Sequence, residues 1–260
     1  MRNIQWKSFR MPAVLVVIFI AASLFSQWSY AEDAICVFVF QKDSAWVVRK
    51  DATVKQSLKV GDSLYDGDKL IVLHGNTVQL SFDREAKNVM QIEGDTELQI
   101  SGAKPTNIDM SSGKIFAVLN KKGPESLFRV STPTAVAAVR GTQFQVNVAG
   151  QQSNILTYQG SVRVSSRDAS GKELPSFVMV DAGQKTSVPS AGIPPKPAQV
   201  LTETEKHDID GVLSKIEESK KVIADGANAK WFEKEKKTAK SSSDTKTAEK
   251  HGSEKGRLIL

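Results

Sequence analysis

The sequence predicts an all-β protein with many short strands in a solenoid-like or roll arrangement, followed by one helix. Between about residues 35 and 188, apolar residues alternate with polar ones, as in strands that bury one face. Val78, Leu80 and Phe82 show this alternation. Turn-forming Gly, Asn and Asp residues separate the runs, often at intervals of about 10–20 residues. No segment in this region has the length and 3.6-residue period of a helix.

The composition is that of a globular protein. The chain has 260 residues, of which 40% are hydrophobic and 25% are charged, and this excludes a collagen, a wholly disordered chain and a protein with several membrane spans. The single cysteine, Cys36, excludes a disulfide framework within the chain and a Cys-rich zinc site, and we expect it to be a buried small hydrophobe. The three histidines, His74, His207 and His251, are far apart in sequence. We therefore expect no metal and no cofactor.

The net charge of +6 comes from the two ends of the chain. Residues 1–31 contain three basic residues and no acidic ones, and residues 226–260 contain nine basic against five acidic residues. The body between them is nearly neutral, so we expect no nucleic-acid partner, which would need a basic face on the fold.

The first 31 residues have the order of a secretory signal peptide. Residues 1–10 carry the basic charges, residues 11–25 are an apolar run, and Ser29 and Ala31 have the spacing of a cleavage site. We predict cleavage after Ala31 and a periplasmic or otherwise exported protein. In the alternative, residues 11–30 stay uncleaved and anchor the protein in the membrane.

The C-terminal part divides into three segments after a β domain at residues 32–188. Residues 189–201 hold four of the nine prolines and are expected to form a linker. Residues 202–225 are expected to form an amphipathic helix whose start Thr202 or Thr204 can cap, and residues 226–260 a disordered charged tail. The helix packs on the β domain or on a partner helix through its apolar stripe of Ile209, Val212, Leu213, Ile216 and Ile223.

Candidate catalytic and metal-binding patterns are weak. Residues 61–64 spell the nucleophile motif of GDSL hydrolases, but none of the three histidines has the aspartate three positions earlier that would complete the set. A hydrolase that uses Ser63 is a remote alternative, and we expect no enzyme. Asp62, Asp66 and Asp68 could bind Ca²⁺, but turn formation explains them better. We expect the aromatic residues beside strands to be core residues: Trp46, Phe82, Phe116, Phe128, Phe144, Tyr158 and Phe177.

The most informative stretch is residues 132–144, TPTAVAAVRGTQF. Arg140 stands between Val139 and Gly141 in an apolar run, so we expect it to lie in a strand. A buried arginine needs partners, and we expect a carboxylate or backbone carbonyls to hold it rather than a ligand. On this interpretation, replacing Arg140 with alanine destabilises the fold by about 1–3 kcal/mol.

Three blocks of sequence, in order, resemble the FecR-domain family. The first is an early turn at residues 61–68, the second is the stretch at residues 132–144, and the third comprises the closing strands around residues 159–164 and 182–184. The motif residues, for which we expect a structural role, are Gly61, Asp62, Gly67, Asp68, Thr132, Pro133, Arg140, Gly141, Thr142, Phe144, Gly160 and Gly183.

The resemblance implies a β-rich extracytoplasmic domain with a solenoid-like twist. The family includes membrane regulators that sense an outer-membrane transporter and control a sigma factor through a cytoplasmic N-terminal domain. Only ten residues precede the apolar run here, so we do not expect that domain. The expected function is a non-catalytic binding or sensing module of the bacterial cell envelope, with an envelope protein or glycan as its partner. The alternative is a membrane-anchored sensor for signal transduction.

Overall fold

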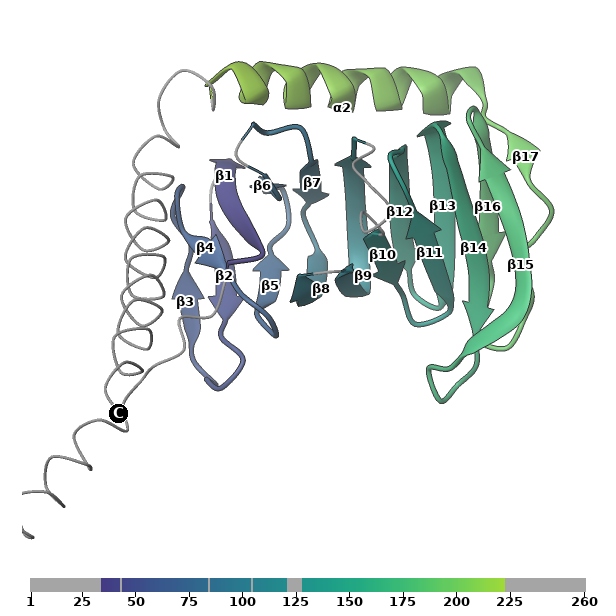
Figure 1. Ribbon diagram of the computed structural model, residues 1–260, viewed down its shortest axis with the longest axis horizontal. Coiled ribbons are helices and arrows are strands. Elements are labelled where there is room, and N and C mark those ends of the chain that lie inside the picture. The colour runs from purple at the N-terminus through teal and green to yellow at the C-terminus, as the bar shows by residue number, and fades with distance from the viewer. Residues whose placement is uncertain (1–33, 43, 84, 104, 121–127, 223–260) are drawn as a thin grey trace, which may run out of the picture. The chain divides into compact units, whose positions relative to one another are not determined.

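The computed structural model describes residues 34–222, except residues 43, 84, 104 and 121–127. This part of the chain forms seventeen strands and one helix, so the predicted all-β class with a C-terminal helix is confirmed (Figure 1). It contains no helix that is long and apolar enough to cross a membrane. The expected signal peptide and the expected charged tail lie outside the described residues.

The strands form two layers, which we call A and B. In layer A every neighbouring pair is antiparallel. The spatial order in layer A is β4 (Ser63–Leu64), β1 (Cys36–Lys42), β6 (Thr77–Ser81), β7 (Val89–Glu93), the second half of β9 (Thr106–Val118), β12 (Gln143–Ala149), β13 (Gln152–Gln159), β16 (Gln184–Val188) and β17 (Gln199–Val200).

Layer B has the first half of β9 at its centre. Its neighbouring pairs are antiparallel except β9 with β10, which are parallel. The spatial order is β3 (Lys55–Ser57), β2 (Ala45–Val48), β5 (Lys69–Val72), β8 (Thr96–Ala103), β9, β10 (Phe128–Ser131), β11 (Ala135–Val139), β14 (Ser161–Arg167) and β15 (Glu173–Asp181).

Strand β9 joins the two layers into one open network of paired strands. It passes from layer B to layer A at Gly113, which has a φ of +94°. A Cβ atom at this position would lie 2.4 Å from the Cα atom of Thr96, so only glycine fits the close approach of β9 to β8.

The hydrophobic core lies between the layers. Phe38, Leu80 and Phe144 from layer A and Leu70 and Ile100 from layer B are all fully buried and belong to one cluster. This cluster follows from the alternation in the sequence, because every second residue of each strand faces the other layer. Cys36 is buried in the same cluster, as expected, and its burial raises the pKa of the thiol.

Helix α2 (Glu203–Val222) lies across the strands on the outer face of layer A (Figure 1). Ile209, Val212 and Ile216 pack there with a second apolar cluster that includes Val37 and Phe116. The predicted stripe therefore packs on the β domain at these three positions and, half-buried, at Leu213, whereas Ile223 lies outside the described residues.

The predicted N-terminal cap of α2 is also present. The backbone N–H of Glu205 donates to the Thr202 hydroxyl (3.3 Å), and the backbone N–H of Thr202 donates to the Glu205 carboxylate (2.8 Å). This reciprocal capping box fixes where the helix starts.

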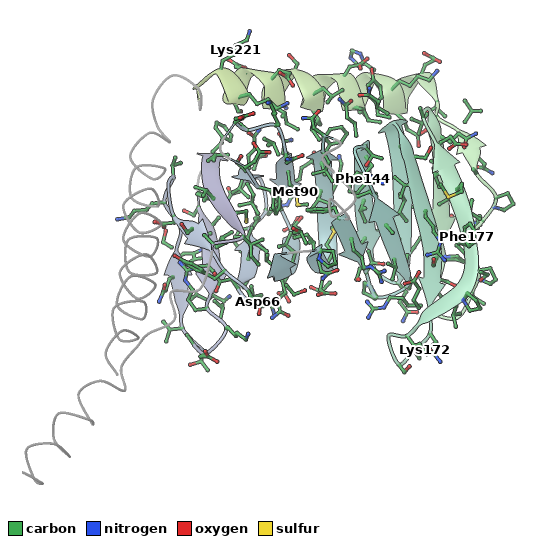
Figure 2. All side chains as sticks on the ribbon, in the orientation of Figure 1. Asp66, Met90, Phe144, Lys172, Phe177 and Lys221 are labelled. Atoms are coloured by element: carbon green, nitrogen blue, oxygen red, sulfur yellow. The ribbon has the colours of Figure 1, made fainter. Side chains whose placement is uncertain are left out.

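The expectation that the aromatic residues beside strands are core residues is wrong for Phe177. Phe144 is buried in the core, but 51% of Phe177 is exposed on β15 (Figure 2). Strand β15 is the last strand of layer B, and Phe177 is on its outward side. The Arg163 guanidinium stacks on the Phe177 ring at 4.5 Å from its centroid, which gives the ring a partner at the surface.

Candidate ligand-binding site

The glycines of the family motif lie where the chain crosses between the layers. Each connects a strand of one layer to the next strand in the other layer, and each has a positive φ of 63–96°. Because this backbone conformation favours glycine, these residues shape the crossings, and none lines either hollow described below. They are Gly61, Gly67, Gly141, Gly160 and Gly183.

Two of these crossings pack against each other. A Cβ atom at Gly160 would lie 2.8 Å from Cγ2 of Thr142 and 3.0 Å from the carbonyl oxygen of Gly141. Thr142 is buried, and its carbonyl accepts a hydrogen bond from the N–H of Leu119 (2.9 Å). The central motif block is therefore a packed corner, followed by Phe144 in the core.

The structure corrects the prediction for Arg140. Strand β11 ends at Val139, so Arg140 lies in the bend before β12 and is exposed. Its side chain makes no hydrogen bond or ion pair with any residue that the structure describes. The expectation of a buried arginine held by partners is therefore wrong.

Thr132 and Pro133 form the turn between β10 and β11. The hydroxyls of Thr132 and Thr134 each lie 2.7 Å from the hydroxyl of Ser153 on β13, and all three residues are buried. Thr132 also accepts a hydrogen bond from the N–H of Ala135 (2.8 Å). This hydroxyl cluster ties the turn in layer B to layer A.

The aspartates of the early turn bond to the chain itself. Asp68 is buried and accepts hydrogen bonds from Arg49 (2.5 Å) and from the N–H of Tyr65 (2.9 Å). Asp62 accepts one from the N–H of Lys59 (2.8 Å). The N–H of Gly102 and the Lys50 ammonium bond to Asp66 and lower the pKa of its carboxyl. These contacts favour turn formation over Ca²⁺ binding, and the described residues contain no cluster of three or more His, Cys, Asp or Glu side chains that could hold a metal.

Neither of the two described histidines supports the hydrolase alternative. His74 lies between β5 and β6 and is bonded to Asp95 (2.7 Å), a contact that raises the pKa of its imidazole. His207 lies on helix α2. Ser63 is on the two-residue strand β4, where its carbonyl accepts a hydrogen bond from Arg49 (3.0 Å).

A hollow of about 310 Å³ lies on the outer face of layer B beside Thr132. Most of the charged and amide side chains that line it bond within the chain. Lys69 pairs with Glu97 (2.6 Å), and this hydrogen bond lowers the pKa of the Glu97 carboxyl. Gln99 donates to the carbonyl of Gly67 (3.0 Å), and Arg167 donates to the carbonyl of Thr132 (2.9 Å).

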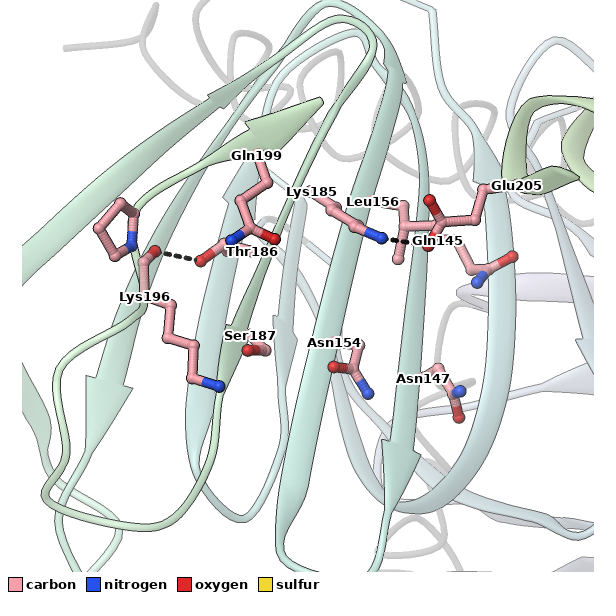
Figure 3. A pocket seen from close by; sticks show the side chains of 11 residues that line it. Gln145, Asn147, Asn154, Leu156, Lys185, Thr186, Ser187, Lys196, Gln199 and Glu205 are labelled. Carbon is pink, nitrogen blue, oxygen red and sulfur yellow. Dashed lines mark hydrogen bonds and ion pairs between the residues drawn. The ribbon is translucent and has the colours of Figure 1, made fainter. Parts of the chain in front are cut away.

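A larger hollow, of about 390 Å³, lies on the outer face of layer A beside the start of α2, and we call it the polar groove (Figure 3). Its floor is β12, β13 and β16. In one row across these strands Asn147 lies opposite Asn154, which lies opposite Ser187. The next row contains Gln145, Leu156 and Lys185, and the remaining lining residues are Thr186, Lys196, Pro197, Gln199 and Glu205.

Several polar side chains that line the groove are unpaired, whereas Lys185 and Thr186 are bonded to Glu205 and to the carbonyl of Lys196. Within the part of the chain that the structure describes, the side chains of Gln145, Asn147, Ser187 and Gln199 make no hydrogen bond. Asn154 uses only its carbonyl oxygen, which accepts from Gln152 (2.7 Å). Amide and hydroxyl groups without protein partners on a half-buried surface are free to bond to a ligand.

The wall of the groove is held by an ion pair. Lys185 donates to the Glu205 carboxylate (2.6 Å) at the first turn of α2. Burial raises the pKa of Glu205, but the hydrogen bonds from Lys185 and Thr202 outweigh this effect, and the pKa lies below its ordinary value. Lys196 is the other cation of the lining, and its side chain extends over the groove (Figure 3).

The sequence alone does not predict this groove. Its residues come from three strands and a later segment, and strand order cannot be deduced from alternation alone. One signal was present, because Gln143, Gln145 and Asn147 place amides at the outward positions of one strand.

Comparison with known proteins gives a family match over part of the chain. Residues 69–163, from β5 to β14, match the family described as "FecR protein", so the predicted resemblance is confirmed there. Two crystal structures of a "putative anti-sigma factor" from Parabacteroides distasonis, at 1.65 and 2.50 Å resolution, are each 14% identical with a TM-score of 0.43. The aligned region covers 54% of this chain and 62% of theirs. No curated protein matches the chain. The family match supports a signalling or sensing role.

Proposed function

Starting from the FecR domain at residues 69–163, we propose that this protein is a non-catalytic binding or sensing module of the cell envelope. Its ligand, part of an envelope protein or a glycan, occupies the polar groove. The family motifs hold the crossings between the layers, and the groove supplies the contacts.

The unpaired side chains of the groove carry this proposal. Gln145, Asn147 and Ser187 stand on strands that are paired on both sides, so the floor is rigid before a ligand arrives. A preformed site loses less conformational entropy on binding. The lining holds no His or Cys, and its one carboxylate, Glu205, is bonded to Lys185, so it suits binding better than catalysis.

Export is part of the proposal and rests on the signal-peptide pattern of residues 1–31. Fractionation of cells followed by N-terminal sequencing tests it. A soluble periplasmic form that begins at Glu32 is the expected result. A full-length form in the membrane fraction would support the alternative, a sensor anchored by residues 11–30.

Co-isolation from a solubilised envelope extract tests the use of the groove. The bait is the tagged protein as cells produce it, beside a Gln145→Ala/Asn147→Ala groove variant and a Gln99→Ala variant in the hollow of layer B. We expect one envelope component to be retained by the wild type and by Gln99→Ala, and to be lost from the groove variant. Equal retention by all three proteins would contradict the proposal.

A further inference from the structure

We infer that the polar groove binds an oligosaccharide that carries a single carboxylate. This inference rests on the proposed function and names the class of ligand. It follows from three properties of the groove, namely its hydrogen-bonding groups, the pairing of its floor and its charge.

The hydrogen-bonding groups match those of a sugar. A carboxamide offers both donors and an acceptor, and a hydroxyl offers both as well, as do the hydroxyls around a pyranose ring. Asn147, Asn154 and Ser187 repeat such groups across three adjacent strands, roughly 4.8 Å apart. Leu156 and Pro197 supply apolar surface for the C–H faces of a sugar ring.

The floor argues against an extended peptide as the ligand. Peptides that bind to sheets add to a free edge, where backbone N–H and C=O groups are unpaired. Strand β13 lies between β12 and β16, and β12 lies between β9 and β13, so their backbone groups are already bonded. The lining also has no pocket of several apolar residues for a peptide side chain.

The charge points to one anionic group on the ligand. Lys185 and Glu205 neutralise each other across the wall at 2.6 Å. Lys196 remains as a cation with no acidic partner among the described residues, and its side chain lies over the floor near Ser187 (Figure 3). One ammonium balances one carboxylate, whereas a phosphate monoester carries a charge of about −1.5 to −2 at neutral pH.

The test compares two disaccharides that differ in one group. Cellobiouronic acid carries a carboxylate where cellobiose carries a hydroxymethyl group. Each is titrated into the ¹⁵N-labelled full-length protein while the side-chain amide resonances of Asn and Gln are followed by NMR. We expect the resonances of Gln145 and Asn147 to move, and the acid to bind about tenfold more tightly, a free-energy difference of about 1.4 kcal/mol.

Two variants assign the effect to residues. Lys196→Gln is expected to remove the preference for the acid, so that the acid and cellobiose bind with similar affinity. Asn147→Ala is expected to weaken the binding of both sugars without lowering the thermal midpoint of the protein. Equal binding of both sugars by the wild type would overturn the carboxylate assignment.

The result also separates this inference from the proposed function. Binding of neither sugar, together with groove-dependent retention of an envelope component, would overturn the inference and leave the proposed function standing. If the groove variant retains the same components as the wild type, the proposed function itself fails.

Discussion

The two hollows of this domain lie on the outer faces of opposite layers and are both lined by polar side chains, but those side chains bond differently. On layer B, Lys69, Gln99 and Arg167 bond to other parts of the chain. On layer A, Gln145 and Asn147 have no hydrogen-bond partner among the described residues. A polar group that is bonded within the chain contributes to stability, whereas an unpaired one on a half-buried surface contributes little and is available to a ligand. The contrast separates residues that hold the fold from residues that we propose contact a ligand.

The largest expected effect is at Arg167. Its guanidinium donates to the carbonyls of Thr132 (2.9 Å) and Gly171 (2.7 Å) and so joins two turns of layer B. Arg167→Ala is expected to lower the free energy of unfolding by about 2–3 kcal/mol, measured by urea denaturation. Lys196→Ala, the matched cation of the groove, should change it by less than about 0.5 kcal/mol. Similar losses of stability in both variants would contradict the contrast between the two hollows.

A second, smaller loss is expected at the crossing that contains Gly160. Alanine there meets Thr142 and Gly141 and must also adopt a φ of +84°, so we expect a loss of about 2 kcal/mol. The control is Gly183→Ala, which has a φ of +76° and open space around the new Cβ atom, and which should lose about 1 kcal/mol. Thermal unfolding of both variants measures the difference, and equal losses would show that the packed corner adds nothing.

The buried hydroxyl cluster gives the next effect. Ser153→Ala leaves the hydroxyls of Thr132 and Thr134 with one partner fewer and is expected to lower stability by about 1–2 kcal/mol. Ser187→Ala in the groove removes a hydroxyl that makes no hydrogen bond within the described residues and should leave the unfolding curve unchanged. The interpretation of the groove would be wrong if Ser187→Ala cost as much as Ser153→Ala.

A small effect is expected at Arg140. Because the structure places this side chain in solvent, Arg140→Ala should change the free energy of unfolding by less than about 0.5 kcal/mol. Differential scanning calorimetry measures it. A loss of 1 kcal/mol or more would restore the sequence-based expectation of a buried, partnered arginine.

Local features of the fold could be predicted from the sequence because they depend on local patterns. The alternation of Val78, Leu80 and Phe82 indicates a strand with one buried face. Thr202 followed three residues later by Glu205 indicates the start of a helix. The apolar stripe of α2 was visible for the same reason. These signals depend on residues within a few positions of one another.

The long-range features could not be predicted. The pairing of β9 with strands of both layers depends on how β7, β8, β10 and β12 are arranged, and alternation gives no order of strands. The expectation for Arg140 is wrong because β11 ends at Val139, and alternation does not show that the strand stops one residue before the arginine. The groove places Asn147 and Ser187, which are forty positions apart in the sequence, in one row on either side of Asn154.

The most direct test of the central claim is the free energy of unfolding of the Gln145→Ala/Asn147→Ala variant, measured by urea denaturation beside Gln99→Ala and the wild type. Side chains that the fold does not use can be removed without loss, and removing groups from a binding site often stabilises a protein. We predict that the groove variant is as stable as the wild type or slightly more stable, while Gln99→Ala loses about 0.5–1 kcal/mol. A loss of more than 1 kcal/mol in the groove variant would show that these amides hold the fold, and would contradict their assignment to a ligand.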